Sequence, residues 1–451
     1  MKILVCGIFL LCLTSCNEKG PAPYDLSILN VQVIDVETGY ILQRNVHIKD
    51  SIIARIENSS SPVSKSALEV IDGSSKYLIP GLWDMHVHIR DSLYLAYFLD
   101  HGIVGVRDMG GCSNIPSNGC ESVCPEQLYR WKMAIAKGEF QGPHLFFAGP
   151  TLSGTGWPTS LPVNTIDQVQ KAFQVNLGNK VDFIKVYEQI PRNSYGEIAR
   201  LSRSNHLDFV GHTSETLLLS EIVELGQKSI EHLREPILYC FTDSSEEMEA
   251  FMVADGYSQA DRELVAPWIN DADKAIASMK ERGTWFTPTM AIQYARQRFA
   301  DSFWLNHELR KKMPLSVNKG LYKHMGLMRL NEDKKGDSLW WMAHKKLVKR
   351  FNKEGIGLLA GSDSACEGTL PGFSLHEELF LMVDAAGLSP LEALKTATVN
   401  PCRYFGFEDR GKIEESHYAD LVLLSSNPLV DIRNTLSIET VIRNGKPVRS
   451  N

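Results

Sequence analysis

Apolar and polar positions follow different patterns at the ends and in the middle of the chain. Their alternation predicts strands at residues 26–35 and 46–56. The other end has strand-like segments at 420–424 and 440–443, followed by a tight-turn signal at Asn444-Gly445. Between these β-rich ends, short apolar segments alternate with helical periodicity, which is typical of a parallel α/β fold.

Eight short apolar segments predict the parallel strands of the middle region. They cover residues 83–88, 103–107, 144–148, 183–187, 208–212, 229–232, 284–289 and 357–362. Residues 215–225 predict an amphipathic helix that ends at Gly226. Two longer segments, 240–280 and 291–350, are mostly helical by pattern and exceed what a barrel needs. The predicted fold class is α/β, specifically a (β/α)8 TIM barrel.

The first sixteen residues have a character of their own. Lys2 precedes an apolar run at 3–13, which is shorter than the roughly 20 residues of a transmembrane helix but fits a signal peptide. LTSC at residues 13–16 resembles a bacterial lipobox, which predicts a signal peptide at 1–15, lipidation of Cys16 and a tether at 16–24. An ordinary signal peptide that happens to contain a cysteine is the alternative. The expected location is the cell envelope, facing the periplasm or the cell surface, with membrane contact only through the lipid.

Composition excludes some classes of partner. The chain has 451 residues, of which 43% are hydrophobic and 22% charged, as in a soluble globular protein with a sizeable core. Its formal net charge is -7 with both signs interspersed, which does not favour nucleic acid or an anionic membrane surface. The sequence leaves a homo-oligomer open.

Six of the nine cysteines remain after the signal peptide and the anchor. Three of them share a loop-like segment, and one disulfide is expected among Cys112, Cys120 and Cys124. A zinc site there would lack a fourth ligand nearby. The others are scattered and are expected to be small buried hydrophobic residues: Cys240, Cys366 and Cys402.

Side chains of metal-binding type stand at the ends of several predicted strands. His86 and His88 are two positions apart, so both point into the barrel. Three more follow the fifth, sixth and eighth strands: His212, His232 and Asp363. Each alone has an ordinary explanation, such as a hydrogen-bonded core histidine or a helix-capping aspartate. Because active sites of barrels are built at these strand ends, their conjunction predicts a metal centre.

Lys185 lies inside an apolar strand, with Tyr187 on the same face. A charged lysine facing a barrel interior is unfavourable, and a protonated amine has no lone pair for a metal. The ordinary interpretation is an amine that reaches solvent at the rim. The alternative is carboxylation by carbon dioxide to a carbamate, whose two oxygens bridge two cations.

These motifs resemble the amidohydrolase superfamily over nearly the whole mature chain. The matching segments are PGLWDMHVH at 80–88, DFIKVY at 182–187, SIEH at 229–232, AGSD at 360–363 and the closing run from 411 to 429. VRDMGG at 106–111 and GPHL at 142–145 resemble the imidazolonepropionase-like and prolidase-like branch, whose members often cleave dipeptides or N-acyl amino acids. The resemblance implies a barrel over 78–395 and a small composite β-sandwich domain built from 25–77 and 396–451.

The resemblance also implies two divalent cations, with Zn²⁺ expected and manganese, iron or cobalt as alternatives. One cation is expected on His86, His88 and Asp363, and the other on His212 and His232. Carboxylated Lys185 and a hydroxide would bridge the two. Asp363 would serve as general base and then general acid.

Two further residues are candidates for contact with substrate. Tyr187 is a candidate donor to the oxyanion, unless it is only a packed strand residue. Arg234 could bind a substrate carboxylate, unless it forms a surface salt bridge. The predicted function is hydrolysis of a C–N amide bond in a dipeptide or N-acyl amino acid. The alternatives are a lactonase or esterase on the same centre, and a catalytically silent binding lipoprotein.

Overall fold

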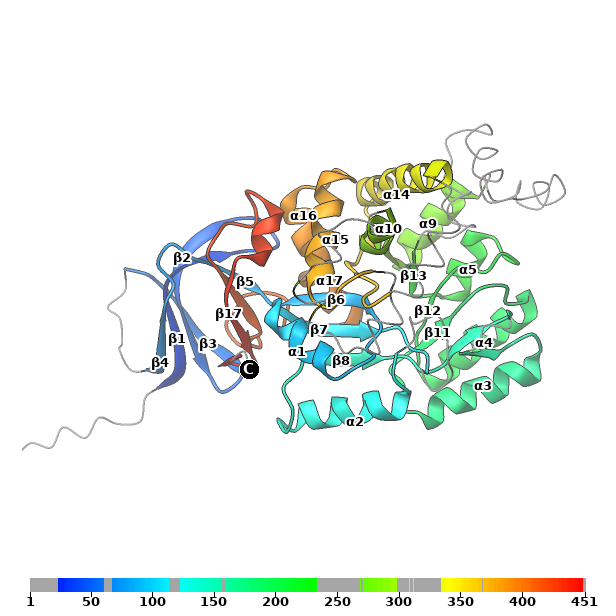
Figure 1. Cartoon of the computed structure of the whole chain (residues 1–451), viewed down its shortest axis with the longest axis horizontal. Coiled ribbons are helices and arrows are strands. Elements are labelled where there is room, and N and C mark those ends of the chain that lie inside the picture. Colours follow the sequence, from blue (N-terminus) through cyan, green and yellow to red (C-terminus); the bar gives the residue numbers. More distant parts are fainter. Residues whose placement is uncertain are drawn as a thin grey trace, which may run out of the picture.

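The structure is a computed structural model that describes residues 23–60, 67–112, 122–155, 159–232, 268, 271–297, 308, 311, 334–366 and 368–448. The predicted signal peptide, Cys16 and Arg234 lie outside these residues. In the described part of the chain, none of the helices combines the length and apolar character needed to span a bilayer. Figure 1 shows a body of helices and parallel strands beside a sheet made from the two chain ends.

The end sheet has eight strands. They are β1 (Tyr24–Ile34), β2 (Ile41–Lys49), β3 (Ile52–Asn58), β4 (Ala67–Asp72), β5 (Tyr77–Pro80), β16 (Leu421–Leu424), β17 (Ile438–Arg443) and β18 (Lys446–Pro447). β16 pairs antiparallel with both β5 and β17, which joins the C-terminal strands to the N-terminal ones. Ile28, Val46 and Leu421 are fully buried in one cluster at this sheet. Both chain ends therefore share one sheet, whereas a separate β-sandwich domain with the boundaries given above stays a prediction.

The single strand predicted at 46–56 is wrong, because the chain turns within it. β2 and β3 pair antiparallel on either side of Asp50, whose φ is 54°. The alternation continues through the turn, so the pattern hides it. The predicted turn at Asn444-Gly445 is present, with φ of 50° and 76°. A Cβ on Gly445 would lie 2.0 Å from the carbonyl oxygen of Asp50, so the close approach of these two turns requires glycine.

The eight strands predicted for the middle region all occur, and they are parallel where they pair. They are β6 (Leu82–Val87), β7 (Ile103–Asp108), β8 (His144–Phe147), β11 (Ile184–Val186), β12 (Phe209–Gly211), β13 (Ser229–Glu231), β14 (Trp285–Thr287) and β15 (Gly357–Leu358). Two short strands that the sequence did not predict, β9 (Thr151–Ser153) and β10 (Ser160–Pro162), extend the sheet beside β11. Isolated parallel bridges, Ala148–Phe183 and Val87–Ser364, connect β6–β8 to the strands on either side.

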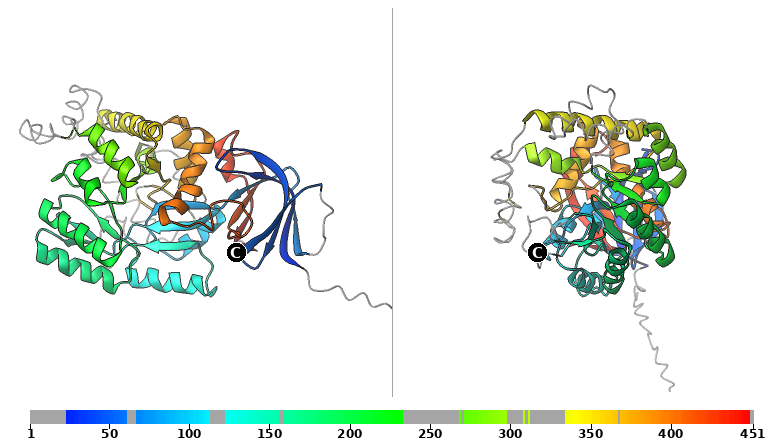
Figure 2. Two further views of the ribbon diagram at one scale, coloured as in Figure 1. Left: turned by 180° about the vertical axis from the view of Figure 1, so that it is seen from behind. Right: turned by 90° about the vertical axis from the view of Figure 1, so that its right-hand side faces the viewer.

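Helices flank the parallel strands in both views of Figure 2. They include α1 (Leu93–Asp100), α2 (Pro125–Ala136), α3 (Ile166–Gly178), α4 (Arg192–Asn205), α5 (Leu219–Leu225), α9 (Ala272–Arg282), α10 (Met290–Gln297), α14 (Lys334–Glu354), α15 (Phe373–Asp384), α16 (Pro390–Thr396) and α17 (Val399–Phe405), with a 3₁₀ turn at Ile432–Leu436. The predicted helix at 215–225 is α5, which begins later and ends at Gly226 in the left-handed region. α9, α10 and α14 fall in the two long helical segments, whose remainder lies outside the described residues.

Candidate metal centre

His86 and His88 leave the carboxyl end of β6 and turn toward Asp363. His86 is fully buried, and its Nε2 lies 3.5 Å from Oδ1 of Asp363. Nε2 of His88 lies 3.4 Å from the same oxygen, while its Nδ1 bonds the carbonyl oxygen of Gly110 at 3.2 Å. Nε2 of His86 has no hydrogen-bond partner within the described part of the chain. A buried nitrogen in that state fits a missing ligand such as a metal ion.

His212 and His232 complete a row of imidazoles. The ring centroids of His232 and His86 are 4.5 Å apart, and those of His212 and His232 are 4.9 Å apart. Nδ1 of His232 bonds Oγ1 of Thr289 at 2.6 Å, and Nδ1 of His212 bonds Oε1 of Glu188 at 3.1 Å. These bonds at Nδ1 fix how each ring is turned and leave Nε2 as the atom for a metal.

Backbone conformation and a backbone hydrogen bond hold Asp363 beside these four imidazoles. Its φ is 54°, and its N–H donates to the carbonyl oxygen of His86 at 2.8 Å. Oδ2 of Asp363 lies 3.8 Å from Nδ1 of His232, so the carboxylate reaches imidazoles from two different strands. His86, His232 and Asp363 form a group whose ligand atoms lie within 4.8 Å of one another. The structure thus brings together all five of the histidine and aspartate ligands expected from the sequence.

Lys185 is interior, not at the rim. It is 2% exposed. Its Cδ would lie 3.0 Å from a Cβ on Gly211 of the neighbouring strand, and the same Cβ would lie 2.1 Å from the carbonyl oxygen of Val186, so that strand needs glycine there. Burial and the charge of Lys185 together lower the pKa of His88 to about 3, and they hold the pKa of His86 well below its usual range. The lysine therefore lies near the row of imidazoles, and its carboxylation stays a prediction.

Tyr187 stacks on His212, with ring centroids 3.9 Å apart. It is therefore beside the centre, and its role as a donor to substrate stays a prediction. The disulfide expected in the nearby loop joins Cys112 to Cys124. Ser122, two residues before Cys124, donates its hydroxyl to the buried carboxylate of Asp108 at 2.8 Å and lies 3.4 Å from Nδ1 of His88.

Sequence reasoning missed a buried ion pair under the centre. Arg107 and Glu231 are both fully buried, with Nη2 of the arginine 2.7 Å from Oε1 of the glutamate. The other carboxylate oxygen of Glu231 lies 2.9 Å from Nδ1 of His86. Arg107 also donates to the Met85 carbonyl at 2.7 Å and to the Tyr404 hydroxyl at 2.9 Å. The signal was present in the motifs, since both residues are charges within apolar strands, as Lys185 is.

A second buried carboxylate ties β6 to the loop that carries Asp363. Asp84 accepts hydrogen bonds from the backbone N–H of Ser362 at 2.9 Å and from its hydroxyl at 2.5 Å. Burial raises the pKa of Asp84 to about 7. Ser362 directly precedes Asp363, so this contact sets the position of Asp363 relative to His86 and His88.

Replacing Glu231 with glutamine is expected to lower both stability and metal affinity. Arg107 would keep its buried charge without a counter-charge, a change that typically costs about 3–5 kcal/mol of unfolding free energy. His86 would lose the carboxylate that orients it, and the loss of such a partner weakens metal affinity roughly 10–100-fold. Denaturant unfolding and metal titration measure the two effects. Glu224→Gln, on an exposed pair with Lys274, is the control; equal stability of the two variants would contradict this role.

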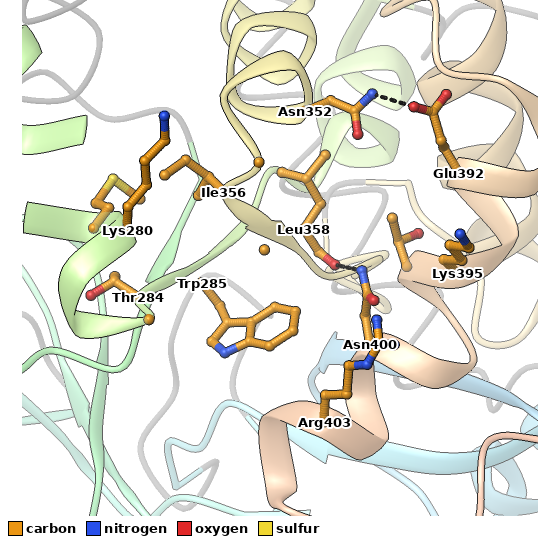
Figure 3. A pocket seen from close by; sticks show the side chains of 15 residues that line it. Lys280, Thr284, Trp285, Asn352, Ile356, Leu358, Glu392, Lys395, Asn400 and Arg403 are labelled. Carbon is orange, nitrogen blue, oxygen red and sulfur yellow. Dashed lines mark hydrogen bonds between the residues drawn. The ribbon is translucent and has the colours of Figure 1, made fainter. Parts of the chain in front are cut away.

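A pocket of about 380 Å³ lies away from these residues, at the amino ends of β14 and β15 (Figure 3). Trp285, Leu358 and Lys395 line it. Two of its other basic residues are engaged elsewhere, Lys280 with Glu354 and Arg403 with Glu37. Since the metal-type ligands stand at the carboxyl ends of the strands, this pocket is not the candidate centre.

Comparison with known proteins agrees with this geometry. The family model for the amidohydrolase family matches residues 77–448. The chain belongs to the amidohydrolase family. The superfamily resemblance inferred from the sequence is confirmed, and this amidohydrolase has its four strand-end histidines and Asp363 inside the matched range.

Two relatives and one solved structure illustrate what this amidohydrolase is similar to. Ochratoxinase from Aspergillus niger is 24% identical over 445 residues, which cover 86% of this chain and 78% of the relative. The match to adenine deaminase 2 from Rhizobium etli is 33% identical over 94 residues, covering 20% of this chain and only 15% of that protein. A crystal structure of a Xaa-Pro dipeptidase superposes with a TM-score of 0.65 at 18% identity, covering 94% of this chain and 99% of that one. The last comparison shows a shared fold.

Proposed function

We propose that this amidohydrolase hydrolyses a C–N amide bond in a small molecule of the dipeptide or N-acyl amino acid type, using two divalent cations. The observation that carries the proposal is the meeting of four histidines and Asp363 at strand ends, beside interior Lys185. Family membership supports hydrolysis of a C–N bond as the class of reaction. The likeness to a Xaa-Pro dipeptidase and to ochratoxinase supports this choice of substrate class.

The proposal includes closure of the parallel strands into a (β/α)8 barrel. Two bridges support it, one joining Ala148 to Phe183 and the other joining Val87 to Ser364. The N–H of Met85 also donates to the carbonyl oxygen of Ala360 at 2.9 Å, at the same seam between β6 and the segment after β15. A closed ring would gather every strand end at one mouth, which is where the ligand set lies.

The donor set fits divalent cations. Imidazole nitrogens and carboxylate oxygens suit zinc, and they also suit manganese, iron or cobalt. His86, His88 and Asp363 would hold one cation, and His212 and His232 the other, with carboxylated Lys185 between them. When bound, the cations would lower the pKa of a water molecule and polarise the scissile carbonyl.

The protein's own groups would then move the proton. Asp363 would accept a proton from the attacking water and deliver it to the leaving nitrogen. Tyr187 would donate a hydrogen bond to the carbonyl oxygen as it gains charge. Glu188 and Glu231 would keep the His212 and His86 rings turned so that Nε2 faces the site.

A substrate screen with metal-loaded protein tests the function. Dipeptides and N-acyl amino acids should be cleaved, and chelation should abolish cleavage. Turnover of lactones or esters alone would favour the esterase alternative. Metal-dependent binding of these compounds without turnover would favour a binding lipoprotein.

Arg234→Ala is expected to raise KM for the best carboxylate-bearing substrate while changing kcat less, because the arginine is proposed to bind the carboxylate in ground state and transition state alike. Kinetics with a substrate and its carboxamide analogue measure this. An unchanged KM for the carboxylate would place the carboxylate-binding group elsewhere.

Cys16→Ser is expected to release the protein into the soluble fraction with its activity kept, because the lipid is proposed as its only membrane contact. Fractionation and mass spectrometry of the mature N-terminus measure this. Wild-type protein that is cleaved elsewhere and carries no lipid would contradict the anchor.

A further inference from the structure

A sixth side chain of metal-binding type lies in the centre, and neither the sequence patterns nor the ligand set above includes it. Cys366 is 2% exposed, and the sequence predicted it only as a small buried hydrophobic residue. Its Sγ, a ring nitrogen of His88 and a carboxylate oxygen of Asp363 all lie within 4.8 Å of one another. The second group of ligand atoms in the described part of the chain therefore contains a thiol.

The backbone holds this thiol in place relative to Asp363. The N–H of Cys366 donates to the carbonyl oxygen of Asp363 at 3.0 Å. Thr369 closes the same turn, because its hydroxyl donates to the Asp363 carbonyl at 3.0 Å and its N–H donates to the Cys366 carbonyl at 2.8 Å. Asp363 is itself bonded to β6, so the carboxylate and the thiol belong to one fixed unit.

Two buried polar groups lie on the side of the centre where Cys366 stands. Tyr94 is fully buried and lies close enough to interact electrostatically with Cys366. Its hydroxyl and Nη1 of Arg90 are both buried, and neither has a hydrogen-bond partner among the residues that the structure describes. The charge of Arg90 acts on both Tyr94 and His88. This side of the centre therefore contains buried polar atoms that no described residue satisfies, which fits a site for a ligand.

We propose that Cys366 is a metal ligand, so that its thiolate joins His86, His88 and Asp363 around one cation. This inference rests on the proposed function and adds to its ligand set. His212 and His232 would hold the other cation, as in the ligand set proposed above. Binding would replace the S–H bond with a sulfur–metal bond and release the proton to solvent. A thiolate is a soft ligand, so it would favour zinc over manganese at this position.

Cobalt substitution tests the proposal directly. A thiolate bound to Co²⁺ adds a near-ultraviolet charge-transfer band, whereas nitrogen and oxygen ligands give only the weaker visible bands. We expect the near-ultraviolet band in the wild-type protein and its loss in Cys366→Ser and Cys366→Ala. Zinc affinity should fall by at least about tenfold, the lower end of what loss of a supporting partner costs. Cys402→Ala is the matched control, because Cys402 is likewise a buried cysteine outside a disulfide but packs in a separate cluster with Trp83 and Met85.

The spectrum also separates this proposal from the proposed function. Visible cobalt bands without the charge-transfer band in the wild-type protein would overturn thiolate ligation and leave the metal-dependent hydrolase standing. Wild-type protein that binds no cobalt or zinc would overturn both. The spectrum of the cobalt-loaded wild-type protein is decisive by itself, so the proposal can be tested even if the Cys366 variants fail to fold.

Discussion

Lys185→Ala is expected to lose at least one metal equivalent and nearly all hydrolytic activity. Neutral imidazoles and Asp363, even with the Cys366 thiolate on one cation, would leave too little negative charge between two neighbouring cations, and a carbamate on Lys185 supplies it. The buried position of the lysine supports this role, since burial disfavours an ordinary ammonium group there. Metal analysis of the purified variant and its turnover of the best substrate measure the two losses.

Chemical rescue separates the carbamate from a merely structural lysine. A short carboxylic acid added to Lys185→Ala should restore part of the metal content and activity by filling the same gap. In the wild-type protein, chelation followed by reloading should recover more activity with bicarbonate than after removal of carbon dioxide. Lys171→Ala, on an exposed pair of α3, is the control. Two bound cations and retained activity in Lys185→Ala would reject the bridging role.

The strand pattern was predictable because the central strands are buried on both faces and are mostly apolar. β6 and β7 are buried at every position, and such continuous apolar runs stand out from the amphipathic helices around them. The ligands were predictable for the same reason, because a histidine or lysine within such a run has no ordinary place in a core. The pattern failed at β9 and β10, which flank the Gly- and Thr-rich sequence GTGWPT at 154–159.

The supporting contacts were not predictable, because they join residues far apart in the sequence. Glu231 meets His86 across 145 positions and Arg107 across 124. A charged residue in an apolar strand indicates that it has a partner of opposite charge, but only the folded structure shows which residue that partner is. Cys366 gave still less signal, since a cysteine after a strand also fits a core as a small hydrophobic residue. The position of Cys366 beside His88 depends on the hydrogen bonds that hold Asp363 and the residues after it against β6.

Asp363→Asn is expected to keep much of the bound metal and to lose turnover by roughly 10²–10⁴-fold, the usual contribution of a general acid–base group. The amide oxygen can still act as a ligand, but it cannot accept a proton from water and return it to the leaving nitrogen. Because the loss would fall on kcat, KM should change little. Metal analysis and steady-state kinetics on the same preparation measure this split.

The position of Asp363 makes that experiment decisive. Its N–H bonds to the backbone of His86, and the neighbouring Ser362 is held by Asp84, so the amide would occupy the same place as the carboxylate. Asp167→Asn on the exposed surface of α3 controls for the loss of one negative charge. If Asp363→Asn turned over substrate near the wild-type rate, another group would have to carry the proton. If it lost its metal as completely as its activity, the aspartate would act chiefly as a ligand, and the proton transfer would need a different residue of the centre.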